Sequence, residues 1–180
     1  MKKIRFKNDL FKTIIIILIL VIVIDLLIFS IAVVVGPSMW PTLSDSDQLV
    51  FVKLPYFRNN PKRGDIIIFS PPKESGRDDL FVKRVVAIEN DKYSIIDGVL
   101  YIDGRKIAED YICDEEYINR SYPVTKGIVP ENMVFVMGDN RNNSNDSRRF
   151  CCIKKQQIEG RVILRIWPLN SIKIFKEPYL

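Results

Sequence analysis

Apolar residues are concentrated in one stretch near the start of this 180-residue chain. Residues 10–35 are apolar throughout, with only Lys12, Thr13, Asp25 and Ser30 as exceptions. A helix of about 20 apolar residues spans the hydrocarbon core of a bilayer. The pattern therefore predicts a single transmembrane anchor over residues 10–35.

The charges around this stretch predict its orientation. The basic residues at the start of the chain are Lys2, Lys3, Arg5, Lys7 and Lys12. Such a bias places residues 1–9 in the cytoplasm and the remainder outside the cell membrane. Orientation and anionic lipid explain much of the net charge of +5, so we expect no nucleic acid partner. A cleavable secretory signal is the alternative, with residues 30–32 as its small-residue site, but the apolar run exceeds the usual 7–15 residues of such a signal.

Asp25 is unusual within the apolar run, because a carboxylate deep in a bilayer costs on the order of 3 kcal/mol. Three placements are open: near the outer interface, protonated within the bilayer, or against a partner helix.

Beyond residue 48, short runs of β-branched and aromatic residues alternate with Gly, Pro, Asn and Asp. This pattern predicts strands rather than helices. The predicted strands cover residues 48–54, 65–69, 80–88, 93–96, 99–102, 133–137 and 162–167. Asp97 and Gly98 separate two of these runs and predict a tight hairpin turn. We expect a mostly β, antiparallel fold.

The outer part of the chain is not uniform in polarity. Residues 91–130 are more polar than the flanking segments, so we expect an insertion between two parts of one extracytoplasmic core, residues 36–90 and 131–180. The three cysteines, Cys113, Cys151 and Cys152, lack the spacing of a metal site, and the chain has no histidine to complete one. We expect free or buried thiols, with pairing of Cys113 as the alternative, and no metal.

Ser38 follows the apolar run closely and is flanked by two prolines, Pro37 and Pro41. Proline fixes φ and prevents a helix from continuing, so Ser38 is predicted in an extended or turn conformation with its hydroxyl exposed. The segment is then either a simple break between anchor and domain or a loop that presents a nucleophile. A nucleophile requires a base, and without histidine the remaining candidate is a lysine whose pKa is lowered.

Lys83 is the candidate for that base, because it lies in a strand, residues 80–88, that is apolar on both faces. Burial among apolar side chains lowers the pKa of a lysine, and the neighbouring Arg84 acts in the same direction. The alternative is a lysine that protects an edge strand from aggregation. A polar run over residues 137–149 follows another strand, and its acids and arginines predict either mutual pairing, a solvated turn or, less consistently with its arginines, a calcium loop.

The anchor and five motifs, in their order along the chain, resemble those of the bacterial type I signal peptidases. The single anchor and short insertion are similar to those of the shorter Gram-positive forms. The motifs are residues 38–43, Arg63-Gly64-Asp65-Ile66, Lys83-Arg84-Val85, Gly138-Asp139-Asn140-Arg141 and Ser144-x-Asp146-Ser147-Arg148. The resemblance implies a membrane-bound serine protease that removes signal peptides from preproteins. It also implies a β catalytic core with an apolar membrane-facing surface.

The same resemblance implies a role for each matching residue. Ser38 corresponds to the nucleophile and Lys83 to the general base, while Ser144 corresponds to a hydroxyl that orients the lysine. The supporting charge pairs are Arg84 with Asp139 and Asp146 with Arg148. No cofactor or metal is implied, the partners are signal peptides and the bilayer, and we expect a monomer.

Some positions depart from the family pattern. Gly36 replaces a serine that helps to bind the oxyanion in some members, and Pro37 has no N–H, so the second oxyanion donor is open. Cys151 or Cys152 replaces a glycine after the Asp-Ser-Arg segment, and Asn90 lies in a loop where Gly-Asp is common. Two other functions remain as alternatives: a tethered β domain that binds exported chains without turnover, and a self-cleaving serine–lysine protease of the SOS repressor type.

Overall fold

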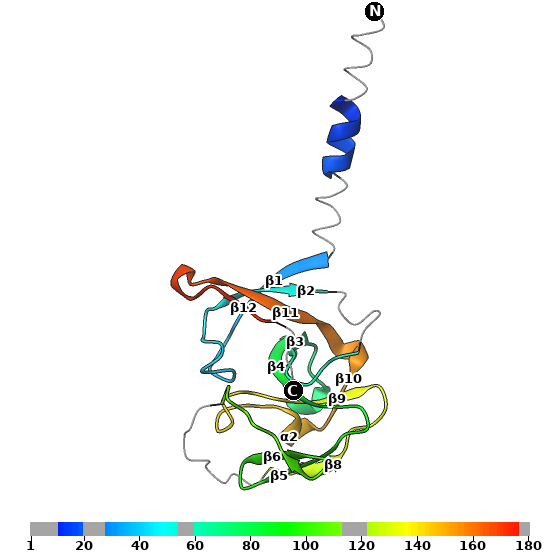
Figure 1. Cartoon of the computed structure of the whole chain (residues 1–180), viewed down its shortest axis with the longest axis vertical. Helices are drawn as coiled ribbons and strands as arrows, with labels where there is room; N and C mark the ends of the chain where they lie inside the picture. Colours follow the sequence, from blue (N-terminus) through cyan, green and yellow to red (C-terminus); the bar gives the residue numbers. More distant parts are fainter. Residues whose placement is uncertain (1–10, 20–27, 54–59, 113–121, 177–180) are drawn as a thin grey trace, which may run out of the picture.

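The computed structural model of the chain describes residues 11–19, 28–53, 60–112 and 122–176. Residues 11–19 are helical and extend away from two β-sheets (Figure 1). Within these described ranges, no helix has both the length and the apolar character needed to cross a membrane. The predicted cytoplasmic segment 1–9, Asp25 and Cys113 lie outside the described residues.

The end of the predicted anchor is a strand. β1 (Phe29–Val33) pairs antiparallel with β2 (Gln48–Val52), with Phe29 opposite Val52 and Val33 opposite Gln48. The prediction of a helix up to residue 35 is therefore wrong over this part. The stretch is rich in β-branched residues, which favour extended backbone when a neighbouring strand is available.

The larger sheet contains eight strands in the order β1-β2-β11-β3-β4-β9-β10, and β12 pairs with β11. All of these pairings are antiparallel. Register shifts interrupt β11 and the β4–β9 pair, and such bulges bend a sheet. The bounds are β3 (Ile66–Phe69), β4 (Phe81–Ile88), β9 (Met133–Met137), β10 (Ile153–Lys154), β11 (Ile158–Trp167) and β12 (Lys173–Ile174).

The smaller sheet contains four strands in the order β7-β6-β5-β8. Its strands are β5 (Lys92–Ile96), β6 (Val99–Ile102), β7 (Arg105–Lys106) and β8 (Lys126–Ile128), all from the polar segment between the two parts of the larger sheet. Asp97 and Gly98 have φ values of 48° and 81° and join β5 to β6, which confirms the predicted hairpin. Figure 1 shows this sheet at the far end of the molecule from β1.

The prediction of a mostly β, antiparallel fold is confirmed, and every predicted strand is present. In the described part of the chain beyond β1, helical structure is limited to the short elements η1 (Lys73–Ser75), α2 (Ser147–Phe150), η2 (Lys155–Gln157) and η3 (Leu169–Ser171).

Three buried apolar clusters hold the sheets together. One cluster joins β4 and β9 to the smaller sheet through residues such as Phe135 and Tyr93, whose ring centroids are 4.2 Å apart. Another packs β2, β3 and β11 around the fully buried Met39 and Leu43. This second cluster fixes the loop that begins at Ser38.

Candidate active site

Ser38 begins a tight turn that follows β1. The Trp40 N–H donates to Pro37 O at 3.1 Å, and the Leu43 N–H donates to Met39 O at 2.9 Å. Met39 and Leu43 are buried in the core below, so the turn is anchored on one side and Ser38 is half-buried on the other. The predicted turn conformation of Ser38 is therefore present.

Lys83 lies in β4, between β3 and β9, and is only 4% exposed. Its Nζ is 2.7 Å from Ser38 Oγ and 2.9 Å from Val82 O. The Phe81 ring lies on the same side of the strand, with its centroid 5.1 Å from Nζ. Because β4 is interior to the sheet, Lys83 is not an edge-strand lysine.

The environment of Lys83 favours a neutral amine. Burial lowers the pKa of Lys83 to about 8, while the charges of Asp146 and Asp139 act in the opposite direction. Arg84, which was expected to contribute to this lowering, is not among the causes. An amine with this pKa is partly unprotonated near neutral pH and can accept a proton from a hydroxyl at hydrogen-bond distance.

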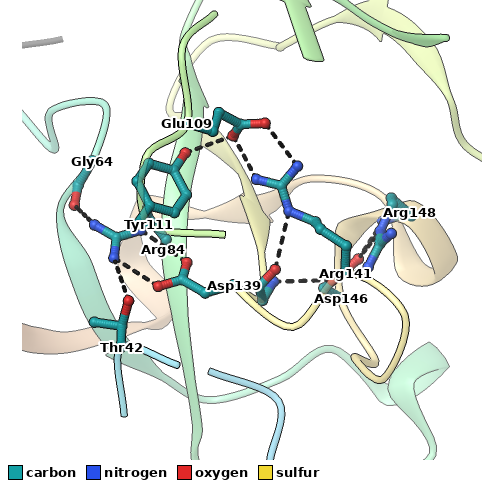
Figure 2. A network of polar contacts seen from close by, with 10 residues as sticks. Thr42, Gly64, Arg84, Glu109, Tyr111, Asp139, Arg141, Asp146 and Arg148 are labelled. Atoms are coloured by element: carbon teal, nitrogen blue, oxygen red, sulfur yellow. Dashed lines mark hydrogen bonds and ion pairs between the residues drawn. The ribbon is translucent and has the colours of Figure 1, made fainter. Parts of the chain in front are cut away.

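Arg84 points to the other side of β4 and is held by four acceptors, as Figure 2 shows. Its guanidinium donates to both carboxylate oxygens of Asp139, at 2.9 and 2.7 Å. It also donates to Gly64 O at 3.0 Å and to Thr42 Oγ1 at 3.4 Å. The structure thus brings together the predicted pair Arg84 and Asp139, and it links the strand of Lys83 to the polar loop after β9.

The other predicted pair, Asp146 and Arg148, is completely buried, with both side chains 0% exposed. Arg148 donates to Asp146 at 2.9 and 2.8 Å, and the Gly138 N–H donates to Asp146 Oδ2 at 3.0 Å. Burial alone would raise the pKa of Asp146, but the hydrogen bonds and charge of Arg148 hold it below its ordinary value. The loop is therefore internally paired, and the described residues contain no cluster of three or more metal-ligating side chains.

Asn140 holds the serine turn, a contact that the sequence analysis did not predict. Its backbone N–H donates to Ser38 O at 3.1 Å, and its side-chain Nδ2 donates to Pro37 O at 3.1 Å. Gly138 lies directly against the same turn, because a Cβ at this position would be 2.4 Å from Ser38 O. The loop after β9 therefore holds the backbone on which the serine hydroxyl is mounted.

Ser144 does not make the expected contact with Lys83. It is buried next to Gly138, but its hydroxyl forms no hydrogen bond with the lysine, whose second partner is Val82 O. Ser144 therefore lies beside Gly138, but the predicted orienting hydrogen bond to Lys83 is absent.

Gly36 cannot act as an oxyanion donor in this conformation. Its N–H donates to Asp45 Oδ1 at 2.6 Å, and its φ of 84° lies in the region that favours glycine. The Ser38 N–H, in contrast, donates to none of the described residues. It is therefore available to a ligand.

A cavity of 740 Å³ opens beside the Ser38–Lys83 contact. It is lined on one side by residues 31–35 from β1 and its continuation, and on the other by residues 80–83 of β4 and its approach. Most of these side chains are apolar. The cavity is therefore an apolar cleft with a serine hydroxyl and a buried amine at its base.

The two departures at glycine positions both have positive φ. Asn90 has a φ of 70° and Cys151 a φ of 69°, so both residues adopt the left-handed region that a glycine would favour. Both positions therefore keep the positive φ that a glycine would favour. Cys151 and Cys152 are both free thiols.

A serine hydroxyl in contact with a buried lysine amine, at the base of an apolar cleft in a β-sheet protein, is typical of hydrolases that use lysine as a base. Residues 7–167 match the protein family described as "Signal peptidase, peptidase S26". The chain therefore belongs to the signal peptidase family, peptidase S26, and is a peptide-bond hydrolase.

The chain is also similar to individual signal peptidases. The chain is 40% identical over 138 residues to "Probable signal peptidase I-1" of Synechocystis sp., covering 74% of this chain and 68% of the relative. It is 34% identical over 181 residues to "Signal peptidase I" of Bacillus licheniformis, covering 93% and 94% respectively. Among solved structures, the chain matches the crystal structure of a signal peptidase I from Enterococcus faecalis, which is 31% identical in sequence, with a TM-score of 0.47. The match covers 57% of this chain and 97% of the Enterococcus faecalis chain.

Proposed function

We propose that this protein is a membrane-bound serine endopeptidase that removes signal peptides from exported preproteins through a Ser38–Lys83 dyad. The observation that carries the proposal is the 2.7 Å contact between Lys83 Nζ and Ser38 Oγ, with Lys83 only 4% exposed. A lysine in this setting has a lowered pKa, so it can act as a base where an ordinary lysine cannot.

In the first step, neutral Lys83 accepts the Ser38 proton as Oγ attacks the scissile carbonyl. The resulting tetrahedral intermediate loses the leaving amine, which takes a proton from the lysine ammonium, and an acyl-enzyme remains. Lys83 then activates a water molecule that hydrolyses the ester. None of these steps requires a metal or cofactor.

The Ser38 N–H is the proposed oxyanion donor, because it points to no acceptor within the described residues. Gly36 is committed to Asp45 and Pro37 has no N–H. Loss of one oxyanion donor costs about 3 kcal/mol where nothing replaces it. A bound water or another backbone N–H would then supply the second hydrogen bond to the oxyanion.

The preprotein would bind as an extended strand within the cleft that β1 and β4 border. In the described part of the chain β1 is the terminal strand of the larger sheet, so its outer edge could pair with a peptide. Small apolar side chains of an A-x-A-like site suit a cleft lined by residues such as Ile31, Val33 and Phe81. The small side chains of the substrate would occupy the part of the cleft beside Ser38.

We also propose that the apolar segment before β1 anchors the protein in the cell membrane, with residues 1–9 cytoplasmic and the catalytic domain outside. Residues 36–90 and 131–180, together with β1, would form the catalytic core, and residues 91–130 an insertion. An anchor directly before β1 keeps Ser38 close to the bilayer surface, where the apolar part of a signal peptide lies. The protein would act as a monomer on lipid-embedded substrates.

The proposal is tested by incubating the purified full-length protein, in detergent, with a preprotein that carries an Ala-x-Ala site. Cleavage after this site is expected in trans. Ser38→Ala and Lys83→Ala should each lower the cleavage rate by more than roughly 1,000-fold while the circular dichroism spectrum is retained.

Ser70→Ala is a matched control, because Ser70 Oγ bonds to Glu159 at 2.9 Å, away from the dyad. This variant should cleave at the wild-type rate. Serine-independent turnover, or cleavage that occurs only within the same chain, would contradict the proposal.

A further inference from the structure

Glu109 occupies an unusual position between two residues of the site. It follows β7 in the segment that carries the smaller sheet, yet its side chain is only 4% exposed. Its Oε2 accepts from Arg141 Nη1 at 2.8 Å, while its Oε1 accepts from Arg141 Nη2 and, at 2.6 Å, from the Tyr111 hydroxyl. Figure 2 shows the carboxylate between Tyr111 and Arg141.

The contacts of Glu109 keep Arg141 charged and Tyr111 protonated. Burial alone would lower the pKa of Arg141, but the hydrogen bonds and charge of Glu109 raise it above its ordinary value. Burial and the charge of Glu109 raise the pKa of Tyr111, so this side chain stays a phenol that can donate. Glu109 therefore accepts three charge-assisted hydrogen bonds, which are stronger than neutral ones.

The first connection leads from Glu109 to Ser38. Arg141 Nε donates to Gly138 O at 3.2 Å, so Arg141 closes the turn over residues 138–141. The same turn presents the two Asn140 groups that bind Pro37 O and Ser38 O. Glu109 thus fixes Arg141, and Arg141 fixes the turn that holds the serine backbone.

The second connection leads from Glu109 to Lys83. The Tyr111 ring lies over the Arg84 guanidinium, with its centroid 3.9 Å from Arg84 Cζ. Arg84 is adjacent to Lys83 in β4 and is also bound to Asp139 at 2.9 and 2.7 Å. Glu109 therefore fixes the orientation of Tyr111, and the ring covers the arginine that holds the strand of the lysine.

We infer that Glu109 and Tyr111 are positioning residues for the Ser38–Lys83 dyad, so that the segment after β7 sets the distance between hydroxyl and amine. This inference rests on the proposed function. It assigns a role in catalysis to a segment that carries none of the catalytic groups. Small displacements at a reacting pair are costly, since a shift of about 1 Å can lower a rate roughly 100-fold.

The test compares Glu109→Gln, Tyr111→Phe and Tyr111→Ala in the full-length protein with a matched control, Asp91→Asn. Asp91 forms a partly buried, two-bonded pair with Arg63, at 2.7 and 2.6 Å, and otherwise bonds to the Ile88 N–H. We expect Glu109→Gln and Tyr111→Ala to lower kcat roughly 10- to 100-fold with KM changed less than about threefold. Tyr111→Phe keeps the ring over Arg84 and should lose less activity than Tyr111→Ala. Asp91→Asn should keep kcat within about twofold once rates are expressed per folded molecule.

A second measurement does not depend on turnover. The Lys83 amine is titrated by NMR in a Ser38→Ala background, in which the charges of Asp146 and Asp139 still act to raise its pKa. Adding Glu109→Gln should raise the titration midpoint toward that of an exposed lysine, because a loosened site admits water, whereas Asp91→Asn should leave it in place.

The inference is overturned if the Glu109 and Tyr111 variants match Asp91→Asn in both kcat and the Lys83 midpoint, or if all of these variants lose activity equally. Failure of the proposed function has a different signature, since Ser38→Ala itself would then retain turnover.

Discussion

Lys83 Nζ and Ser38 Oγ lie 2.7 Å apart, although 45 positions separate the two residues in the chain. One comes from an interior strand and the other from a turn after an edge strand. The contact therefore exists only in the folded sheet, and the loop after β9 stabilises it from the serine side. Three predictions depend on this geometry, and a fourth concerns the backbone at Cys151.

Cleavage should depend on the charge of Lys83. Because its pKa is lowered to about 8 by burial, the active neutral form is lost as pH falls. At pH 7 about a tenth of the amine is neutral, and each further unit of acidification should reduce kcat/KM about tenfold. The measurement is kcat/KM between pH 6 and 10 with a peptide that does not titrate in this range. A rate that stays constant down to pH 6 would exclude a lysine base.

The buried amine should also cost stability. Lys83→Met removes the base, so it should abolish cleavage, yet it should raise the free energy of unfolding at pH 7 by about 2 kcal/mol. The sign follows from the lowered pKa: between about pH 8 and the unfolded value of 10.5 the unfolded state binds more protons, so wild-type stability rises with pH through this window.

The advantage of Lys83→Met should therefore shrink across the same window. Urea unfolding at pH 7 and at pH 10.5 measures both values. An equal stability difference at the two pH values would show that the lysine is not buried as a poorly solvated amine.

Gly138 should tolerate no side chain. A Cβ there would be 2.3 Å from Ser144 Oγ and 2.4 Å from Ser38 O, so the serine turn must shift. We expect Gly138→Ala to lower kcat roughly 100-fold. Gly104→Ala is the control, because its φ is 78° but no atom lies within 4 Å of the added carbon. It should lose stability through its backbone, by about 1 kcal/mol, and keep full activity.

The folded protein should be more stable with glycine in place of Cys151. Its φ of 69° and ψ of −165° lie in a region that almost only glycine occupies, at a cost of about 1–3 kcal/mol for other residues. Cys151→Gly should therefore raise the free energy of unfolding by about 1 kcal/mol without changing kcat. Cys152→Gly is the contrasting variant, since Cys152 packs against the core cluster of β4, β9 and the smaller sheet and should be destabilised. A melting temperature that falls in Cys151→Gly would contradict the proposed strain.

The strands and the dyad could be predicted because their signals are local. β4 is an apolar run interrupted only by Lys83 and Arg84, and the Asp97-Gly98 turn requires positive φ at two adjacent positions, which few residue pairs adopt. β1 could not be predicted in the same way. Its small residues, Ser30 and Ala32, alternate with large ones, but the surrounding run is apolar at every position, so the period of two is concealed.

The supporting residues of the site were harder to find than the dyad. Glu109 and Tyr111 lie in a polar segment without a regular pattern, and their partners Arg141 and Arg84 are distant in the chain. Nothing in the local sequence distinguishes them from solvated residues. Asn140 was visible within a polar loop, but its bonds to the serine turn depend on how that loop packs in three dimensions.

The position of β1 also affects how the purified protein can be handled. Among the residues that the structure describes, one edge of this strand is unpaired, and Phe29, Ile31 and Val33 expose apolar side chains along the strand. Unprotected edges of this kind recruit one another. Solutions from which detergent has been removed should therefore accumulate oligomers joined through β1, and an amphiphile or a short extended peptide that covers this edge should keep the protein monodisperse and suitable for crystallisation.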